Sequence, residues 1–338
     1  MCKDGEKKAF DLDFDYEHYN YDDINVGDIY IGNITTVDMK LKSGFVTMVG
    51  KPNVGKSTLL NRIMGQKLAI TSNKPQTTRK KIRAVYTEDD RGQIVFIDTP
   101  GIHKSSTKLG EYMENIVAKA IENVDVIIWL VPPKVPMSKS DYNIKKTLEK
   151  INKPVIVGIN KIDMVKKTQM LKILKFFGEQ CDFATICPFS ARTGNGIKEL
   201  LDNIFKMLPY GPFYYDKEEY TDQTERGLVS EIIREKSLHA LRDEIPHGIA
   251  VTVEYMRERK DKPIYDIDAT IFCERDSHKG IIIGKGGQML KKIGINARYE
   301  IEKMLDMKVN LKIRVKVKKD WKENISFLKD LGYMDDIE

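Results

Sequence analysis

The sequence predicts a doubly wound α/β domain with a mostly parallel sheet, followed by a smaller α+β domain. Four apolar runs between residues 43 and 209 have the length of buried strands: "GFVTMVG", "IVFIDTP", "VIIWLV" and "PVIVGIN". Stretches with helical spacing separate the later runs, which is typical of parallel strands joined by crossover helices. After residue 226 a helical stretch is followed by segments in which apolar and polar residues alternate, which favours strands that are buried on one face only.

These patterns divide the chain into four segments. Residues 1–42 are acidic and aromatic without a clear period, so we expect an N-terminal extension that is disordered or only loosely structured. Residues 43–209 form the α/β domain. Residues 210–225, "YGPFYYDKEEYTDQTE", contain Gly, Pro and charge and are interpreted as a linker. Residues 226–338 form the second domain.

The second domain has its own order of expected elements. A helical stretch, "LVSEIIREKSLHALRDEI", ends near Pro246, and strands follow at about 249–257 and 264–274. "HKGIIIGKGGQMLKKIGINARYEIEKML" then has helical spacing after its glycines. The last strand, residues 309–317, places apolar residues on one face and Asn, Lys and Arg on the other.

Composition excludes several protein classes. The 338 residues are 41% hydrophobic, enough for a sizeable core, and no apolar run approaches the roughly 18 residues of a membrane-spanning helix. The N-terminus resembles neither a signal peptide nor a transit peptide. The four cysteines form no C-x-x-C pair, so reduced thiols are expected.

The net charge of +6 hides an asymmetry along the chain. Residues 1–42 have ten acidic residues against five Lys, whereas residues 279–319 have twelve Lys and Arg against three acidic residues. A local basic block indicates a polyanionic partner better than the total charge does. A solvated charged face is the alternative interpretation.

The stretch "GKPNVGKS" fits the phosphate-binding pattern G-x-x-x-x-G-K-[ST] from Gly50 to Ser57. An apolar run precedes it and a helical pattern follows, as a phosphate loop at a helix N-terminus requires. Lys56 would reach the β- and γ-phosphates, and Ser57 would bind Mg²⁺. A glycine-rich turn without a ligand is the alternative. The predicted phosphate contacts are Gly50, Lys51, Asn53, Val54, Gly55, Lys56, Ser57 and Thr58.

The motif "NKID", Asn160 to Asp163, selects the base. It follows the apolar run "PVIVGI", at the carboxyl edge where nucleotides bind in such sheets. The Asp163 carboxylate can accept from the ring N–H and the amine of guanine, a pair of donors that adenine lacks. The sequence therefore predicts GTP and GDP as ligands. Lys161 lies in the same motif, and Ser190 and Ala191 of "SAR" would support the base.

"DTPG" and "KPQTTR" complete the expected site. Asp98 is placed to hold Mg²⁺ through water, and the Gly101 N–H to meet the γ-phosphate. Either Thr77 or Thr78 would join the Mg²⁺ shell, with Thr78 favoured; a plain polar loop is the alternative. The residues expected to act in catalysis are thus Lys56, Thr78 and Gly101.

Together these motifs resemble the Era branch of the translation-factor-type GTPases. The resemblance rests on "GKPNVGKSTLLN", "KPQTTRKKI", "FIDTPGIHK", "NKID", "EIIREK", "ERDSHKGIIIGKGGQMLKKIG" and "VKVKKDW", and it covers about residues 39–335. It implies a P-loop GTPase domain followed by a type II KH domain. It also implies GTP hydrolysis, binding to the 3′ end of small-subunit ribosomal RNA, and a role in ribosome maturation. The expected location is the cytoplasm, with peripheral contact at the inner face of the membrane, and the chain is expected to be a monomer.

Within this resemblance, "GKGG", Gly284 to Gly287, would be the loop that clamps about four nucleotides of single-stranded RNA. Lys285 would meet phosphate, and Gly286 and Gly287 would allow close approach. Ile282 and Ile283 are candidates for an apolar groove, although core packing is their default interpretation. Lys291 and Lys292 would add phosphate contacts.

One departure from Ras-type enzymes concerns the mechanism. Ile102 stands where those enzymes place the Gln that orients the attacking water, so slow intrinsic hydrolysis is predicted. In related GTPases an Asn at the position of Asn53 helps to bind K⁺, which makes K⁺ a candidate cofactor. An ATP-dependent kinase and a membrane-surface protein regulated by GTP are the competing function classes.

Overall fold

The computed structural model describes residues 40–72, 74, 77–101, 107–242 and 245–333. Residues 1–39, which make up most of the predicted N-terminal extension, lie outside the described residues. The two predicted domains, from residue 38 onward, belong to one unit of densely contacting residues. No helix in the described part of the chain is long and apolar enough to cross a membrane. Cys181, Cys187 and Cys273 are buried free thiols.

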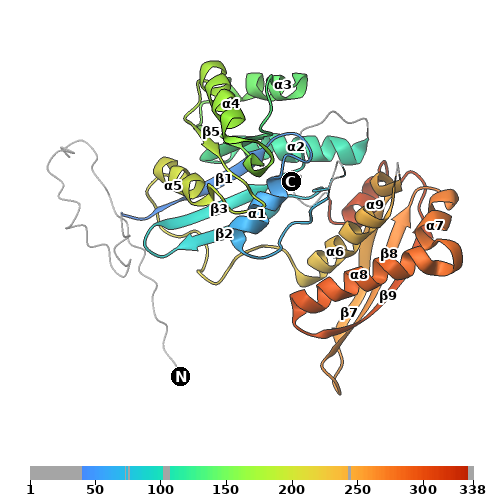
Figure 1. Cartoon of the computed structure of the whole chain (residues 1–338). Helices are drawn as coiled ribbons and strands as arrows, with labels where there is room; N and C mark the ends of the chain where they lie inside the picture. Colours follow the sequence, from blue (N-terminus) through green and yellow to red (C-terminus); the bar gives the residue numbers. More distant parts are fainter. Residues whose placement is uncertain (1–39, 73, 75–76, 102–106, 243–244, 334–338) are drawn as a thin grey trace, which may run out of the picture. The chain divides into compact units, whose positions relative to one another are not determined.

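The first domain is built on a six-stranded sheet in the order β2-β3-β1-β4-β5-β6 (Figure 1). β2 is antiparallel to β3, and every other neighbouring pair is parallel. The predicted mostly parallel sheet is therefore confirmed, with one antiparallel edge. The strands are β1 Lys42–Val49, β2 Ile82–Glu88, β3 Gly92–Asp98, β4 Val126–Val131, β5 Val155–Ile159 and β6 Thr185–Pro188.

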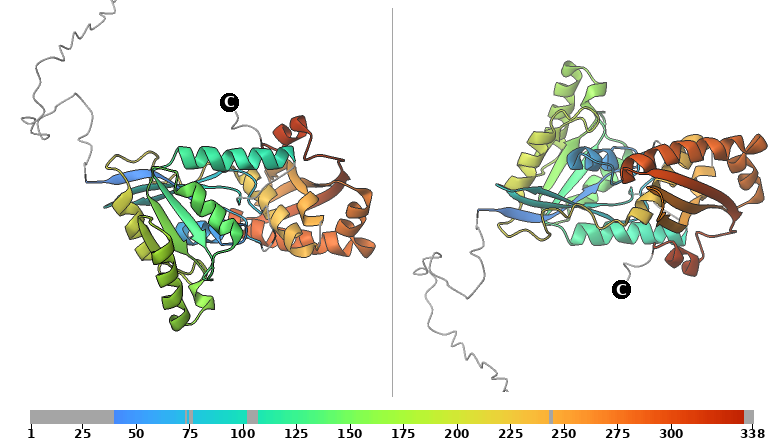
Figure 2. Two further views of the ribbon diagram at one scale, coloured as in Figure 1. Left: turned by 90° about the horizontal axis from the view of Figure 1, so that it is seen from above. Right: turned by 90° about the horizontal axis from the view of Figure 1, so that it is seen from below.

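Helices cover both faces of this sheet (Figure 2). Their bounds are α1 Lys56–Met64, α2 Lys108–Glu122, α3 Lys139–Leu148, α4 Lys167–Gln180 and α5 Ile197–Met207. Alternate residues of β4 point to opposite sides. Ile128 packs in the core with α1 and α5, whereas Trp129 packs in the core with α2, α3 and α4. This two-sided burial explains why the central strands are continuously apolar.

The topology places the site at one edge of the sheet. β1 pairs with β3 on one side and with β4 on the other, so the strand order reverses direction at β1. Ligands of doubly wound sheets bind at the carboxyl ends of the strands beside such a reversal. The loops that follow β1, β3, β5 and β6 contain the phosphate loop, "DTPG", "NKID" and "SAR", respectively.

The second domain has a three-stranded sheet in the order β7-β8-β9. β7 and β8 are antiparallel, whereas β8 and β9 are parallel, which confirms the predicted α+β fold. Its elements are α6 Glu225–Ala240, η4 Ile245–Gly248, β7 Ala250–Glu258, β8 Ile264–Cys273, α7 Asp276–Ile283, η5 Lys285–Gly287, α8 Gln288–Leu305, β9 Lys308–Val317 and α9 Ile325–Asp330. Helix α6 ends earlier than the sequence predicts, because Leu241 adopts an extended backbone and buries its side chain in the domain core.

The predicted linker runs along the first domain. The side-chain oxygen of Gln93 in β3 accepts hydrogen bonds from the backbone N–H groups of Tyr214 and Tyr215, at 2.9 and 3.0 Å. The Arg83 guanidinium of β2 lies over the Tyr215 ring, 4.3 Å from its centroid. The linker is thus anchored to the edge of the sheet by contacts that its composition did not reveal.

Candidate nucleotide site and nucleic-acid interface

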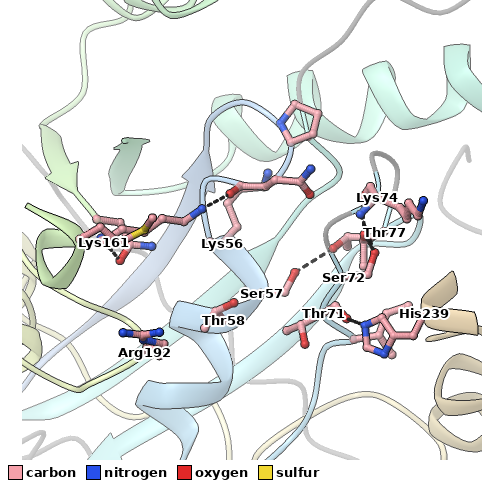
Figure 3. A pocket seen from close by; sticks show the side chains of 18 of the residues that line it. Lys56, Ser57, Thr58, Thr71, Ser72, Lys74, Thr77, Lys161, Arg192 and His239 are labelled. Carbon is pink, nitrogen blue, oxygen red and sulfur yellow. Dashed lines mark hydrogen bonds between the residues drawn. The ribbon is translucent and has the colours of Figure 1, made fainter. Parts of the chain in front are cut away.

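The phosphate loop lies between β1 and α1, as predicted. Gly55 has φ 107°, which only glycine adopts readily, and an added Cβ would collide with the Asn160 side chain. Helix α1 begins at Lys56, so its free N–H groups face a hollow of about 510 Å³. Figure 3 shows Lys56, Ser57 and Thr58 within this hollow.

One buried side chain joins the phosphate loop to the two other predicted motifs. Asn160 donates from Nδ2 to the Val54 carbonyl oxygen at 2.8 Å. Its Oδ1 accepts from the N–H groups of Lys161 and Ala191, at 2.7 and 3.0 Å. Lys161 also donates from Nζ to the Asn53 carbonyl oxygen at 2.7 Å. "NKID" and "SAR" are therefore held against the phosphate loop, although Asn160 and Val54 are 106 positions apart along the chain.

The Asp163 carboxylate is oriented from two sides. The Ser190 hydroxyl donates to Oδ1 at 2.6 Å, and Arg192 Nη2 lies 2.8 Å from Oδ2. The hydrogen bond from Ser190, with the Arg192 charge, holds the pKa of Asp163 below its usual value. An ionised carboxylate in this place can accept two N–H groups from a base, which is the chemistry of guanine recognition.

Three oxygen-bearing side chains meet beside Lys56. Ser57 Oγ lies 2.9 Å from Thr78 Oγ1 and donates to Asp98 Oδ2 at 3.1 Å. Thr78 is 7% exposed. Thr77 also lines the hollow, but its hydroxyl donates to the Lys74 carbonyl oxygen at 2.7 Å and not to this cluster. The structure thus places Thr78, not Thr77, beside the two predicted magnesium residues.

The electrostatics of this cluster favour a bound cation. Asp98 is fully buried, and burial raises its pKa to about 6 against the opposing charge of Lys56. Its Oδ1 has no hydrogen bond of normal geometry within the described part of the chain. Burial also lowers the pKa of Lys56. Hydroxyl and carboxylate oxygens are the ligands that Mg²⁺ prefers, so these residues fit a magnesium ion.

The other predicted nucleotide residues differ in what their side chains do. Gly101 and Asn53 line the hollow. The Lys51 ammonium is 2.6 Å from the buried carboxylate of Asp141, so only the backbone of Lys51 is left for a phosphate. Ile102, which bears on the attacking water, lies outside the described residues.

His239 and Thr71 are among the residues of the hollow that were not predicted from the sequence. His239 comes from α6 of the second domain, and its Nε2 lies 3.0 Å from the carbonyl oxygen of Thr71 (Figure 3). Thr71 belongs to the loop between α1 and β2. No sequence motif links these positions, because their proximity depends on how two distant segments pack.

The "GKGG" loop joins α7 to α8, as the prediction requires. Gly286 and Gly287 have φ 60° and 77°, and space around an added Cβ is open at both positions. Lys285 is exposed. An exposed glycine loop followed at once by a helix N-terminus offers N–H groups to a phosphate backbone.

Beside the loop lies a hollow of about 380 Å³, lined by residues of α8 and β9: Gly287, Leu290, Lys291, Gly294, Ile295, Arg298, Leu311 and Ile313. It combines two cations with an apolar floor, which suits single-stranded nucleic acid. Lys292 does not line this hollow and faces a separate one with His239 and Tyr299. Lys291 and Lys292 therefore lie on different surfaces of the second domain.

Of the two interpretations of Ile282, an RNA groove and core packing, the structure supports core packing. Ile282 is fully buried in the core of the second domain, because the face of α7 on which it lies packs inward. Ile283 is half-buried against the same core. The basic face of β9 is also less free than its charge suggests, since Arg314 and Lys316 lie 3.5 and 4.0 Å from Asp268 and Glu254.

Comparison with known proteins agrees with this division. Residues 45–161 match the family model described as 50S ribosome-binding GTPase, and residues 244–322 match the KH domain model. GTPase Era of Clostridium novyi (strain NT) is 52% identical over 292 residues, covering 86% of this chain and 99% of the relative. GTPase Era of Ruminiclostridium cellulolyticum is 50% identical over 295 residues, covering 87% and 98%.

Two solved structures align with the chain at a TM-score of 0.83 and 37% identity, each covering 87% of this chain and 99% of the other. One is a variant of Aquifex aeolicus Era bound to GDP·AlF₄⁻. The other is Era in complex with MgGDPNP and nucleotides 1506–1542 of 16S ribosomal RNA.

Proposed function

Because the chain belongs to the Era family of GTPases, we propose that it is a GTP-hydrolysing switch that binds the 3′ region of small-subunit ribosomal RNA. Its role would be the assembly of the small ribosomal subunit. The observation that carries this proposal is the convergence of three motifs on the buried Asn160, in a chain whose second domain exposes a glycine loop.

The nucleotide would lie along the hollow. Lys56 and the N–H groups that open α1 bind the phosphates, because a buried cation and a helix N-terminus both favour negative charge. Asp163 accepts the two guanine donors, and Ser190 keeps this carboxylate oriented. The remaining predicted contacts are supplied by the backbone at Gly50, Lys51, Val54, Gly55 and Ala191.

A magnesium ion would be held by the hydroxyls of Ser57 and Thr78, with Asp98 acting through water. When bound, it offsets the negative charge of the phosphates. Support comes from the 2.9 Å separation of the two hydroxyls and from the buried Asp98 Oδ1, which has no hydrogen bond of normal geometry to any described residue. The Gly101 N–H would orient the γ-phosphate from the opposite side.

Hydrolysis would be slow without a partner. The chain has Ile102 where a water-orienting Gln stands in Ras-type enzymes, so the attacking water needs another group. Asn53 lines the hollow beside Lys56 and is the residue through which K⁺ would act. A GTPase rate that is equal in Na⁺ and K⁺ buffers would remove K⁺ from the proposal.

RNA would bind to the second domain at the "GKGG" loop and at the adjoining hollow on α8. Lys285, Lys291 and Arg298 contact phosphates there, while Leu290 and Ile295 contact bases. The proposed location is the cytoplasm, where ribosomes are assembled, with peripheral contact at the inner face of the membrane. Sedimentation with anionic liposomes tests that contact.

The proposal is tested by calorimetry with the full chain. We expect GTP and GDP to bind in the presence of Mg²⁺, and ATP at equal concentration neither to bind nor to compete. Crosslinking to total RNA should recover the 3′ region of 16S ribosomal RNA. Preference for ATP would favour the kinase alternative. An association with the ribosome that does not weaken as salt rises would indicate a protein partner instead of RNA.

A further inference from the structure

The loop between α1 and β2, residues 65–81, contains Thr78 and is contacted by the second domain at several points. Its apolar anchor is Ile70, which is 4% exposed and packs in the core of the second domain. Apolar packing alone leaves the register of a loop loosely specified, because it is not directional. The polar contacts of the same loop are more specific.

Glu235 of α6 holds the start of this loop. Its carboxylate is 1% exposed and accepts from Thr71 N at 2.8 Å and from Thr71 Oγ1 at 3.3 Å. Lys67 Nζ lies 2.5 Å from the second carboxylate oxygen, and Lys236 Nζ lies 2.9 Å from it. Burial opposes the charge on Glu235, but the hydrogen bonds from Lys67 and Thr71 hold its pKa below the usual value.

Arg234, the preceding residue of α6, holds the end of the loop. Its side chain is 1% exposed. The guanidinium donates hydrogen bonds to both carboxylate oxygens of Glu231 and to the carbonyl oxygen of Thr77. Thr77 immediately precedes Thr78 in the chain. On the other side of Thr78, Arg79 donates to the Ile249 and His247 carbonyl oxygens, at 2.7 and 3.2 Å. Both neighbours of Thr78 are thus bonded to the second domain.

We infer that Arg234 and Glu235 are positioning residues of the GTP site, which act by fixing the loop that presents Thr78 to magnesium and the γ-phosphate. Neither side chain lines the hollow, so each acts through the loop and not on the nucleotide itself. This inference rests on the proposed function. It assigns the link between the RNA-binding domain and hydrolysis to two adjacent side chains of one helix.

Binding of GDP and binding of a GTP analogue should depend differently on the loop. GDP needs the phosphate loop and Asp163 but has no γ-phosphate for Thr78 to approach. A GTP analogue needs the loop in place as well. Loosening the loop should therefore weaken binding of the triphosphate and slow hydrolysis, and it should leave GDP affinity unchanged. It should also raise the Mg²⁺ concentration required for the half-maximal rate, because Thr78 is an ion ligand in the proposal.

The test uses full-length Arg234→Lys and Glu235→Gln. Lysine keeps the charge but cannot bond Glu231 and the Thr77 carbonyl as a planar fork, and glutamine keeps the shape but loses the charge. We expect kcat and the affinity for a non-hydrolysable GTP analogue to fall about tenfold, the effect of losing one charge-assisted hydrogen bond. GDP affinity should stay within about twofold of wild type, by the same reasoning.

Matched controls lie on the same helix. Glu225 and Arg226 are exposed in its first turn, so Glu225→Gln and Arg226→Lys should behave as wild type. Equal losses of GDP and GTP-analogue affinity in the test variants would show a merely structural role and overturn the inference, as would wild-type kcat and Mg²⁺ dependence. A wild-type protein that ignores GTP would instead overturn the proposed function.

Discussion

The hydroxyl of Thr78 lies 2.9 Å from that of Ser57, although the two residues come from different elements. Asp98, at the end of β3, accepts a hydrogen bond from the same Ser57 hydroxyl. Thr77 is only one residue away but bonds back to its own loop through Lys74. The adjacent threonines therefore provide an internal control for the site.

Thr78→Ala should lower kcat for GTP by at least about tenfold and should weaken binding of a GTP analogue, because it removes a hydroxyl from the proposed magnesium shell. Single-turnover GTP hydrolysis at varied Mg²⁺ measures this. Thr78→Ser keeps the hydroxyl and should recover most of the rate. Thr77→Ala should stay close to wild type, and the account of the cluster is wrong if Thr77→Ala costs as much as Thr78→Ala.

Asp163→Asn should exchange the base preference of the site. The variant presents an amide donor where guanine also donates, so GTP affinity should fall about 100-fold while xanthosine triphosphate gains. Calorimetry with both nucleotides measures the exchange. Asp182→Asn, at an exposed position of the same domain, should change neither affinity. Unchanged GTP affinity in Asp163→Asn would remove Asp163 from base recognition.

Gly286→Asp should weaken RNA binding through charge. The residue has φ 60°, which Asn and Asp tolerate better than other side chains, and an added Cβ meets no atom within 4 Å. A carboxylate beside the RNA backbone should cost at least about tenfold in affinity at low salt, and the loss should narrow as salt rises. Gly286→Asn imposes the same backbone demand without charge.

Fluorescence anisotropy with a fragment of the 16S 3′ region measures both variants across a salt series. We expect Gly286→Asn to stay within about threefold of wild type, since an exposed Asn at this φ adds little strain. Equal losses in the two variants would mean that shape, not charge, matters at the loop, and no loss in either would place the RNA elsewhere.

Glu235 makes the loop contact sensitive to acid. Its pKa lies below the usual value in the folded protein, so the unfolded chain binds the proton more tightly. The stability from this carboxylate is fully present above about pH 4.5, the ordinary glutamate range, and is lost as pH falls through the lower folded value. The free energy of unfolding of the wild type should therefore be about 1–2 kcal/mol larger than that of Glu235→Gln at pH 7.

Urea unfolding at several pH values between about 3 and 7 measures this difference, which should hold above about pH 4.5 and shrink below it. The exposed Glu225→Gln should show no comparable trend. A difference between wild type and Glu235→Gln that is constant over this range would mean that the ion pairs with Lys67 and Lys236 contribute nothing through charge.

The sequence was sufficient where a motif dictates its own local geometry. The strand–glycine loop–helix pattern around Gly50 to Ser57 predicted the phosphate loop, because the required φ and the helix N-terminus are local properties. The alternation along residues 309–317 predicted β9 and its buried face for the same reason. The preference for Thr78 over Thr77 agrees with the observed hydroxyl geometry.

The sequence was insufficient where position depends on distant segments. Ile282 stands next to the glycine loop, but the packing of α7 turns its side chain into the core. The contact between Glu235 and Thr71 joins residues 164 positions apart, and no periodicity encodes it. The linker looked like a tether by composition, whereas Gln93 of β3 fixes it to the sheet.

The most direct test of the switch is the affinity of the full chain for the 3′ fragment of 16S ribosomal RNA, measured in three nucleotide states. We expect tighter binding with a non-hydrolysable GTP analogue than with GDP or without nucleotide, because only the triphosphate engages Thr78 and Gly101 together. Identical RNA affinities in all three states, in a protein that binds guanine nucleotides normally, would contradict the account.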